Sequence, residues 1–211
     1  MSTKSITVAI VEDSPGLRNS FEAILQRAPG LKWVGSFADG EQAVRDLPAL
    51  RPQVVLMDIN LPGMSGVQCV AHLAHTLPDT ALIMVTVHDD TDAIFDSLAA
   101  GAGGYLLKPV RSAQLIAAIS EILAGGAPMS ANIARRVVQA FRIPPAPAAE
   151  LVHLAPRERE ILDFLVKGLL LKEIAGYLGI SYWTVQEYTA RIYQKLHVHS
   201  RSQAVAKYLG K

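Results

Sequence analysis

The N-terminal half of the chain alternates short runs of apolar, largely β-branched residues with longer segments of helical periodicity. Short runs that are almost continuously apolar are typical of parallel strands covered on both faces. Such runs occur at residues 6–11, 31–37, 54–58, 81–87 and 104–107. The helical patterns lie near residues 15–28, 40–47, 66–76, 90–100 and 112–124. Five successive strand–helix units predict an α/β fold with a doubly wound, five-stranded parallel sheet.

A proline-rich segment divides the chain. Residues 143–149 carry three prolines within four positions, which excludes a helix and favours an extended linker. A short helical pattern precedes this segment at residues 130–141, and further helical patterns without a credible strand follow near residues 156–167, 171–178, 182–196 and 200–208. We therefore predict an α/β domain over residues 1–126, a linker containing a short helix over 127–150, and a small all-α domain over 151–211.

Composition narrows the class of protein. Half of the 211 residues are hydrophobic and 18% are charged, so the chain can bury a core and is not intrinsically disordered. No apolar run approaches the roughly 18 residues of a membrane span, and the N-terminus lacks the pattern of a secretory signal. We expect a soluble, cytoplasmic protein without a membrane partner. The single cysteine, Cys69, excludes an intramolecular disulfide and a metal site built on cysteines.

Charge is distributed unevenly between the two halves. Residues 1–128 carry 8 basic and 13 acidic side chains, whereas residues 151–211 carry 9 basic and 5 acidic ones. This asymmetry indicates different partners for the two domains: a cation for the first and a polyanion for the second.

Charged and hydroxyl side chains stand at the ends of the predicted strands. Glu12 and Asp13 follow the first strand, Asp58 ends the third, Thr86 lies at the end of the fourth, and Lys108 follows the fifth. The carboxyl ends of parallel strands meet at one edge of the sheet, so we expect these side chains to converge. Crowded carboxylates repel one another and favour a hard cation such as Mg²⁺. Asp58 can then attack phosphorus, with the metal and Lys108 neutralising negative charge.

This half of the chain resembles the receiver domain of two-component response regulators. The resemblance covers about the first 125 residues and rests on the following positions: Glu12-Asp13, Asp58, the run Leu61 to Gly66, Thr86, Tyr105 and Lys108-Pro109. It implies that a sensor histidine kinase phosphorylates Asp58 and that Lys108 contacts the phosphoryl group. It also implies a magnesium site made of Glu12, Asp13, Asp58 and the backbone carbonyl of Asn60.

The same resemblance implies a conformational switch. Thr86 moves to hydrogen-bond the phosphoryl oxygens, and Tyr105 turns inward into the space that Thr86 leaves. The output is a changed surface around the fourth helix, the fifth strand and the fifth helix.

The C-terminal helices predict a helix-turn-helix. The helix at 171–178 ends at Gly179, and Ser181 is placed to cap the next helix, which is the geometry that brings a helix N-terminus into the major groove of DNA. Residues 150–209 resemble the output domain of the LuxR and NarL type. The two halves together resemble a response regulator of the NarL/FixJ type.

This second resemblance implies a DNA-binding transcriptional regulator that forms homodimers on phosphorylation and binds double-stranded promoter DNA. The candidate DNA contacts are Lys172, Ser181, Thr184, Gln186, Tyr188, Arg191, Lys195 and Arg201. Similar proteins usually have Lys or Arg, Asn and His where this chain has Gln186, Glu187 and Tyr188. A carboxylate such as that of Glu187 repels phosphates, so we expect weak affinity or an unusual sequence preference.

Two other functions stay open on the sequence. A phosphorylation-gated module that binds protein is favoured by Glu187 and by the apolar pairs Leu170-Leu171 and Tyr182-Trp183. A phosphotransferase acting on an external substrate would need a second carboxylate two residues after the nucleophile, as in proteins that resemble haloacid dehalogenases. Asn60 occupies that position and cannot transfer a proton, so we expect no enzyme activity beyond the domain's own phosphorylation and dephosphorylation.

Overall fold

The computed structural model describes residues 5–141, 154–196, 198 and 200–209. The chain divides into two compact units, residues 1–135 and 136–211. The proline-rich segment of the predicted linker lies outside the described residues. Within the described ranges, no helix combines the length and the apolar character that crossing a bilayer requires.

A parallel sheet forms the centre of the first unit, with its strands in the order β2-β1-β3-β4-β5. The strands are β1 (Ile6–Val11), β2 (Leu31–Phe37), β3 (Val54–Met57), β4 (Ala81–Thr86) and β5 (Gly104–Leu107). The predicted five-stranded parallel sheet is confirmed. The third and fourth strands each end one residue earlier than predicted, so Asp58 and Val87 lie just beyond the ladder.

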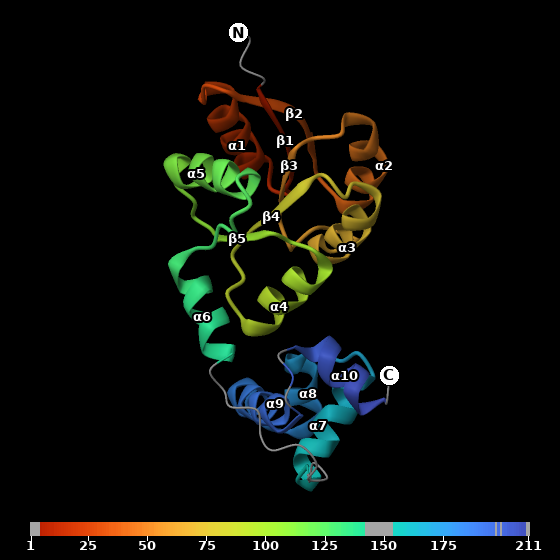
Figure 1. Ribbon diagram of the computed structural model, residues 1–211. Coiled ribbons are helices and arrows are strands. Elements are labelled where there is room, and N and C mark those ends of the chain that lie inside the picture. Colours follow the sequence, from red (N-terminus) through yellow and green to blue (C-terminus); the bar gives the residue numbers. More distant parts are fainter. Residues whose placement is uncertain (1–4, 142–153, 197, 199, 210–211) are drawn as a thin grey trace. The chain divides into compact units, whose positions relative to one another are not determined.

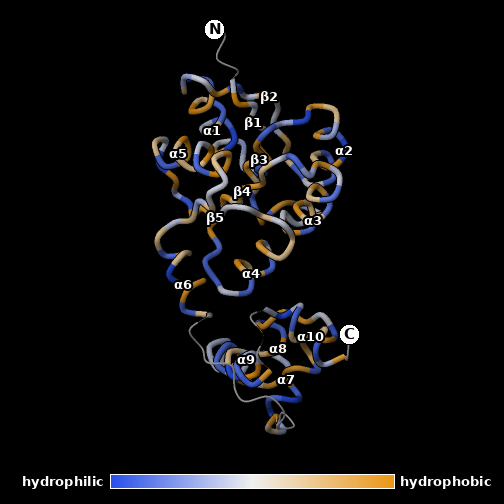
Figure 2. The backbone as a smooth tube through the Cα atoms, viewed as in Figure 1, coloured by the Kyte–Doolittle hydropathy of each residue, from blue (hydrophilic) through white to orange (hydrophobic). Residues whose placement is uncertain are grey.

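Helices cover both faces of this sheet (Figure 1). Helices α1 (Pro15–Arg27) and α5 (Ser112–Leu123) pack on one face, and their apolar residues join those of the strands in a single core. The other face carries α2 (Gly40–Leu50), α3 (Gly66–Thr76) and α4 (Thr91–Ala100). Hydropathy alternates along these outer helices, as expected of helices with one buried face (Figure 2).

Helix α2 is longer than predicted. Its sequence pattern ends at residue 47, before Pro48, but the helix continues to Leu50. Pro48 removes one amide donor from the helix, but helical bonding resumes after it, since Arg51 donates to the Leu47 carbonyl at 3.0 Å.

After α5 the chain returns to the edge strand β5. Met129 forms a parallel bridge with Tyr105, whose amide donates to the Pro128 carbonyl at 2.8 Å. Helix α6 (Ala131–Phe141) begins immediately afterwards. We call residues 128–130 the edge strap, because they pair with backbone groups that an edge strand would otherwise leave exposed.

The second unit is helical and is built from α7 (Pro156–Val166), α8 (Leu171–Leu178), α9 (Tyr182–Leu196) and α10 (Arg201–Tyr208). Buried apolar residues from all these helices make one core. Gly179 has φ +63°, a left-handed conformation that glycine adopts without strain and that ends α8. Ser181 then accepts a hydrogen bond from the Thr184 amide at 3.1 Å, which caps α9. The predicted helix-turn-helix is therefore present.

The packing of α3 against the end of β3 generates a prediction about stability. A Cβ atom at Gly66 would lie 1.8 Å from the Asp58 carbonyl oxygen, whereas one at Gly16 in α1 would have nothing within 4 Å. We expect Gly66→Ala to lower the free energy of unfolding of the first unit by about 2 kcal/mol or more. Gly16→Ala, the matched control, should leave it unchanged or raise it by up to about 1 kcal/mol.

Urea unfolding of the full chain measures both variants. A Trp183→Phe background leaves Trp33, in the first unit, as the only tryptophan whose fluorescence is followed. Equal unfolding midpoints for the two alanine variants would contradict the predicted close approach.

Candidate functional site

Three carboxylates gather at the carboxyl ends of the strands. Oxygen atoms of Glu12, Asp13 and Asp58 all lie within 4.8 Å of one another. Glu12 and Asp58 are buried, whereas Asp13 is exposed. The Asp58 amide donates to the Val11 carbonyl at 2.9 Å, which continues the β1–β3 pairing by one residue and holds the two strand ends together. The residues that the sequence predicted to converge from β1 and β3 are thus adjacent.

Lys108 connects two of these carboxylates. Its Nζ lies 2.6 Å from Glu12 Oε2 and 2.8 Å from Asp58 Oδ2, and all of these side chains are less than a tenth exposed. The Lys108 amide donates to the Thr86 carbonyl at 2.8 Å, which fixes the backbone that carries the ammonium. Since burial of a charge is costly unless the charge is paired, this ammonium offsets part of the cost of burying both carboxylates.

The cluster has three carboxylates but only one ammonium among the contacts described, so negative charge is in excess. Burial raises the pKa of Glu12 above its ordinary value of 4.5, although the hydrogen bond from Lys108 acts in the opposite direction. Folding therefore makes the ionised form of Glu12 less favourable than it is in water. A cation that reached this carboxylate would offset part of that cost.

The two predicted switch residues meet at one backbone segment. Thr86 is fully buried, and its hydroxyl accepts a hydrogen bond from the His88 amide at 3.4 Å. Tyr105 is also fully buried, and its hydroxyl donates to the His88 carbonyl at 3.0 Å. Burial raises the pKa of Tyr105. The Tyr105 ring is therefore buried in this structure, and the movement of Thr86 and Tyr105 on phosphorylation stays a prediction.

His88 is a residue of the site region that the sequence did not single out. Its Nε2 lies 2.9 Å from Asn60 Oδ1, so it links the loop after β4 to the loop after β3. The only sequence signal is its position two residues after Thr86, at the same edge of the sheet. The Asn60 side chain is therefore engaged, and the role of its backbone carbonyl as a metal ligand stays a prediction.

The candidate DNA contacts fall into two groups in the second unit. Lys172, Gln186 and Arg191 are exposed, and Tyr188 is half-buried. The others have partners within the unit, although Ser181 and Lys195 are exposed as well: Ser181 and Thr184 cap α9, Lys195 Nζ lies 2.6 Å from Glu158 Oε2, and Arg201 donates to the Leu165 carbonyl at 2.6 Å.

Lys195 joins α9 to α7 through a buried carboxylate. Burial acts to raise the pKa of Glu158, but the hydrogen bonds from Lys195 and from the Ala155 amide outweigh it and hold the pKa below the ordinary 4.5. Glu158 is thus ionised at neutral pH and serves the helix packing. The Lys195 side chain is 42% exposed, so a phosphate would compete with Glu158 for its ammonium.

Arg191 has partners on its own helix. Its guanidinium lies 3.7 Å from Glu187 Oε2, and its Cζ lies 5.6 Å from the centre of the Tyr188 ring. Both side chains of the ion pair are more than half exposed, so the pair is weak and can exchange partners.

Exposed apolar side chains lie near the turn. Leu170 is 64% exposed and Trp183 is 74% exposed, whereas Leu171 packs partly against the core. Tyr182 is 47% exposed as well, so three of the four apolar side chains predicted to form a patch are exposed.

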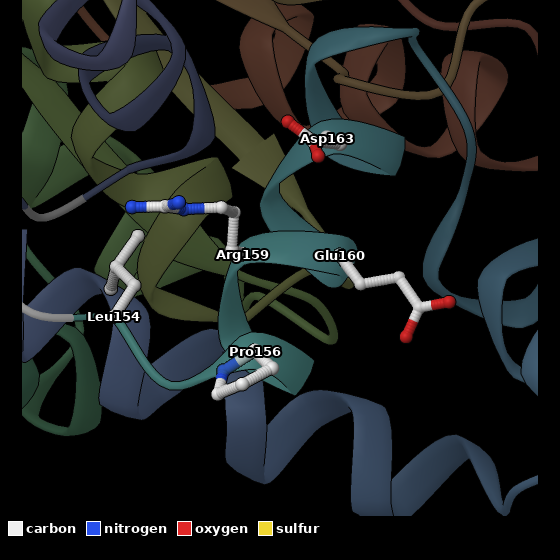
Figure 3. A pocket seen from close by; sticks show the side chains of 5 residues that line it. All are labelled: Leu154, Pro156, Arg159, Glu160 and Asp163. Carbon is white, nitrogen blue, oxygen red and sulfur yellow. The ribbon is translucent and has the colours of Figure 1, made fainter.

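A hollow of about 560 Å³ opens beside the start of α7 (Figure 3). Its lining residues are Leu154, Pro156, Arg159, Glu160 and Asp163. They carry charges of both signs and include none of the residues predicted for phosphorylation, metal or DNA. The chemistry expected from the sequence lies elsewhere.

Each of the two units matches a known protein family. Residues 8–120 match the response regulator receiver domain, and residues 152–208 match the bacterial regulatory proteins of the LuxR family. The transcriptional regulatory protein UhpA of Escherichia coli (strain K12) is 34% identical over 193 residues, which cover 92% of each chain. The response regulator UvrY of the same strain is 31% identical over 194 residues, 92% of this chain and 89% of UvrY.

A solved structure is similar as well. The crystal structure of a two-component response regulator of the LuxR family from Aurantimonas sp. SI85-9A1 has a TM-score of 0.62 and 30% identity, and the match covers 65% of this chain and 98% of that one. With a receiver domain at the N-terminus and a LuxR-family domain at the C-terminus, the chain belongs to the two-component response regulators of the NarL/FixJ type.

Proposed function

We propose that a sensor histidine kinase transfers a phosphoryl group to Asp58 and that phosphorylation controls binding of the second unit to promoter DNA. The observation that carries this proposal is the buried Asp58 carboxylate, held at the strand ends between an ammonium and two further carboxylates. Membership of the response regulator family supports the kinase as the phosphoryl donor.

The transfer needs one bond to form and one to break. A carboxylate oxygen of Asp58 attacks the phosphorus of a phosphohistidine, the P–O bond forms, and the P–N bond breaks with its electron pair leaving on the imidazole. Lys108 Nζ, 2.8 Å from Asp58 Oδ2, is placed to neutralise charge on the phosphoryl oxygens. The Ile59 amide donates to Asp58 Oδ1 at 2.7 Å and helps to orient the nucleophile.

The donor set fits Mg²⁺. Three carboxylates and one ammonium leave the cluster with a formal charge of −2, which a divalent cation balances, and hard oxygen donors are the ligands that Mg²⁺ prefers. Glu12, Asp13 and Asp58 would hold the ion together with the Asn60 carbonyl. When bound, the ion supplies positive charge for the phosphoryl oxygens.

Covalent labelling tests the acceptor. The full-length chain is incubated with radiolabelled acetyl phosphate and Mg²⁺, and protein-bound label is measured. We expect Asp58→Asn to abolish labelling because the nucleophilic oxygen is lost, and Lys108→Ala to slow it about 100-fold because charge neutralisation is lost. Asp46→Asn, which changes an exposed carboxylate of α2 paired with Arg45, is the control and should label like the wild type. Label retained by Asp58→Asn would refute the assignment.

For the output we propose that the N-terminus of α9 enters the major groove of promoter DNA. The geometry of α8, the Gly179 turn and α9 supports this docking mode. The exposed residues Lys172, Gln186 and Arg191 are the contacts that this surface favours. We propose that phosphorylation produces a homodimer, which lets two such units occupy paired half-sites.

Anisotropy titrations on genomic fragments, chosen by footprinting of the wild type against Asp58→Asn, test DNA binding. We expect Lys172→Ala to weaken binding to all fragments and to reduce the slope of log K against log salt by about 1. Gln186→Ala should cost about 1–3 kcal/mol on the preferred fragment alone. Lys32→Ala, a change of the same kind in the first unit, is the control. A wild type that binds no fragment specifically, phosphorylated or not, would defeat the proposal.

A second candidate function is a phosphorylation-gated contact with a protein. The exposure of Leu170 and Trp183, together with the partial neutralisation of Arg191 by Glu187, favours it. In that case Trp183→Ala should abolish phosphorylation-dependent capture of a partner in a pull-down, and Arg191→Ala should leave it intact. If the second unit binds DNA instead, we expect the reverse. Arg191→Ala then lowers the affinity for DNA, and Trp183→Ala has no effect on the protein pull-down.

A further inference from the structure

The edge strap holds the part of β5 that leads into Lys108. The Ser130 amide donates to the Tyr105 carbonyl at 3.1 Å, and the Ser130 hydroxyl accepts from the Leu107 amide at 2.9 Å. Together with the bond from the Tyr105 amide to Pro128, these contacts fix alternate residues of the strand from outside the sheet. Leu107 directly precedes Lys108, so the last contact of the strap lies one residue before the lysine whose ammonium contacts Asp58.

Ser130 also starts the next helix. It immediately precedes α6, and its carbonyl accepts from the Ala134 amide at 3.0 Å, the first hydrogen bond of that helix. A serine in this position usually caps its own helix with its hydroxyl. Here the hydroxyl accepts from β5 instead, so one residue joins the strand end to the first turn of α6.

We propose that Ser130 is a positioning residue for the phosphorylation site and couples it to α6. The inference rests on the proposed function, because it takes Asp58 as the phosphoryl acceptor. Ser130 acts through Leu107 and Lys108 and does not touch the phosphoryl group.

The physical basis is that Lys108 and the strap order the same piece of backbone. A phosphoryl group on Asp58 gives the Lys108 ammonium a further anionic partner, which restrains the end of β5. A restrained strand end keeps the Leu107 amide aimed at the Ser130 hydroxyl, and this strengthens the anchor of α6. Linkage is reciprocal, so an intact strap in turn favours the phosphorylated state.

The wild-type chain provides the first measurement. Amide hydrogen exchange of Leu107 and Ala134 is followed by NMR in the full-length protein, with Mg²⁺ alone and with Mg²⁺ plus beryllofluoride as the phosphoryl mimic. We expect beryllofluoride to slow exchange at both amides by about threefold or more. Unchanged exchange at both amides despite saturation with beryllofluoride would overturn the coupling.

Variants of Ser130 provide the second measurement, the apparent Kd for beryllofluoride. We expect Ser130→Ala to raise it about threefold, the same factor by which beryllofluoride slows exchange, because only the strengthening of this hydrogen bond on binding is lost, and to remove the response of Ala134 exchange. Ser130→Thr keeps the hydroxyl, so it should restore both the wild-type Kd and the response of Ala134 exchange. Ser120→Ala is the matched control, since it deletes an exposed hydroxyl that donates to the Ile116 carbonyl at 3.1 Å within α5.

The outcomes separate this inference from the proposed function. A wild type that does not bind beryllofluoride in the presence of Mg²⁺ would defeat the phosphorylation site itself. A Ser130→Ala variant with wild-type affinity and a wild-type exchange response would defeat the role of Ser130 and leave the phosphorylation site standing. Should Ser130→Ala not fold, the wild-type exchange measurement and Ser130→Thr still decide.

Discussion

The ammonium of Lys108 between Glu12 and Asp58 is the interaction on which the first unit depends. It joins the ends of β1, β3 and β5, which are far apart in the sequence and meet only because parallel strands finish at one edge. Without a cation, two carboxylates this deeply buried would be costly to keep ionised and would tend to take up protons instead. The sheet therefore brings the carboxylates together, and the lysine offsets part of the cost of keeping them ionised there.

The second unit uses the same kind of ion pair for a different purpose. Lys195 meets a single buried carboxylate, Glu158, so the charges balance and the pair joins two helices. In the first unit one ammonium serves two carboxylates with a third beside them, and the negative charge left over favours binding of a cation. The number of carboxylates around the ammonium thus separates a pair that supports packing from a cluster suited to chemistry.

Periodicity and the strand-end rule predicted most of this architecture. Apolar runs located every strand of the sheet, and the residues after those runs meet in space. What the sequence could not predict depends on contacts between distant segments. The edge strap is three residues long and pairs through backbone atoms, which no residue type signals. Lys195 and Arg201 contact Glu158 and the Leu165 carbonyl because α7 packs against α9 and α10. The bond between His88 and Asn60 depends on the conformations of two loops.

The edge strap also limits how copies of the chain can associate. With its outer edge occupied by residues 128–130, β5 has no free row of amides and carbonyls along Tyr105 for a strand of another molecule. Association on this side must then use side chains and helix surfaces. Contacts of that kind can form and dissolve as a charge is added or removed, whereas a sheet continued from one molecule into the next would be far harder to take apart.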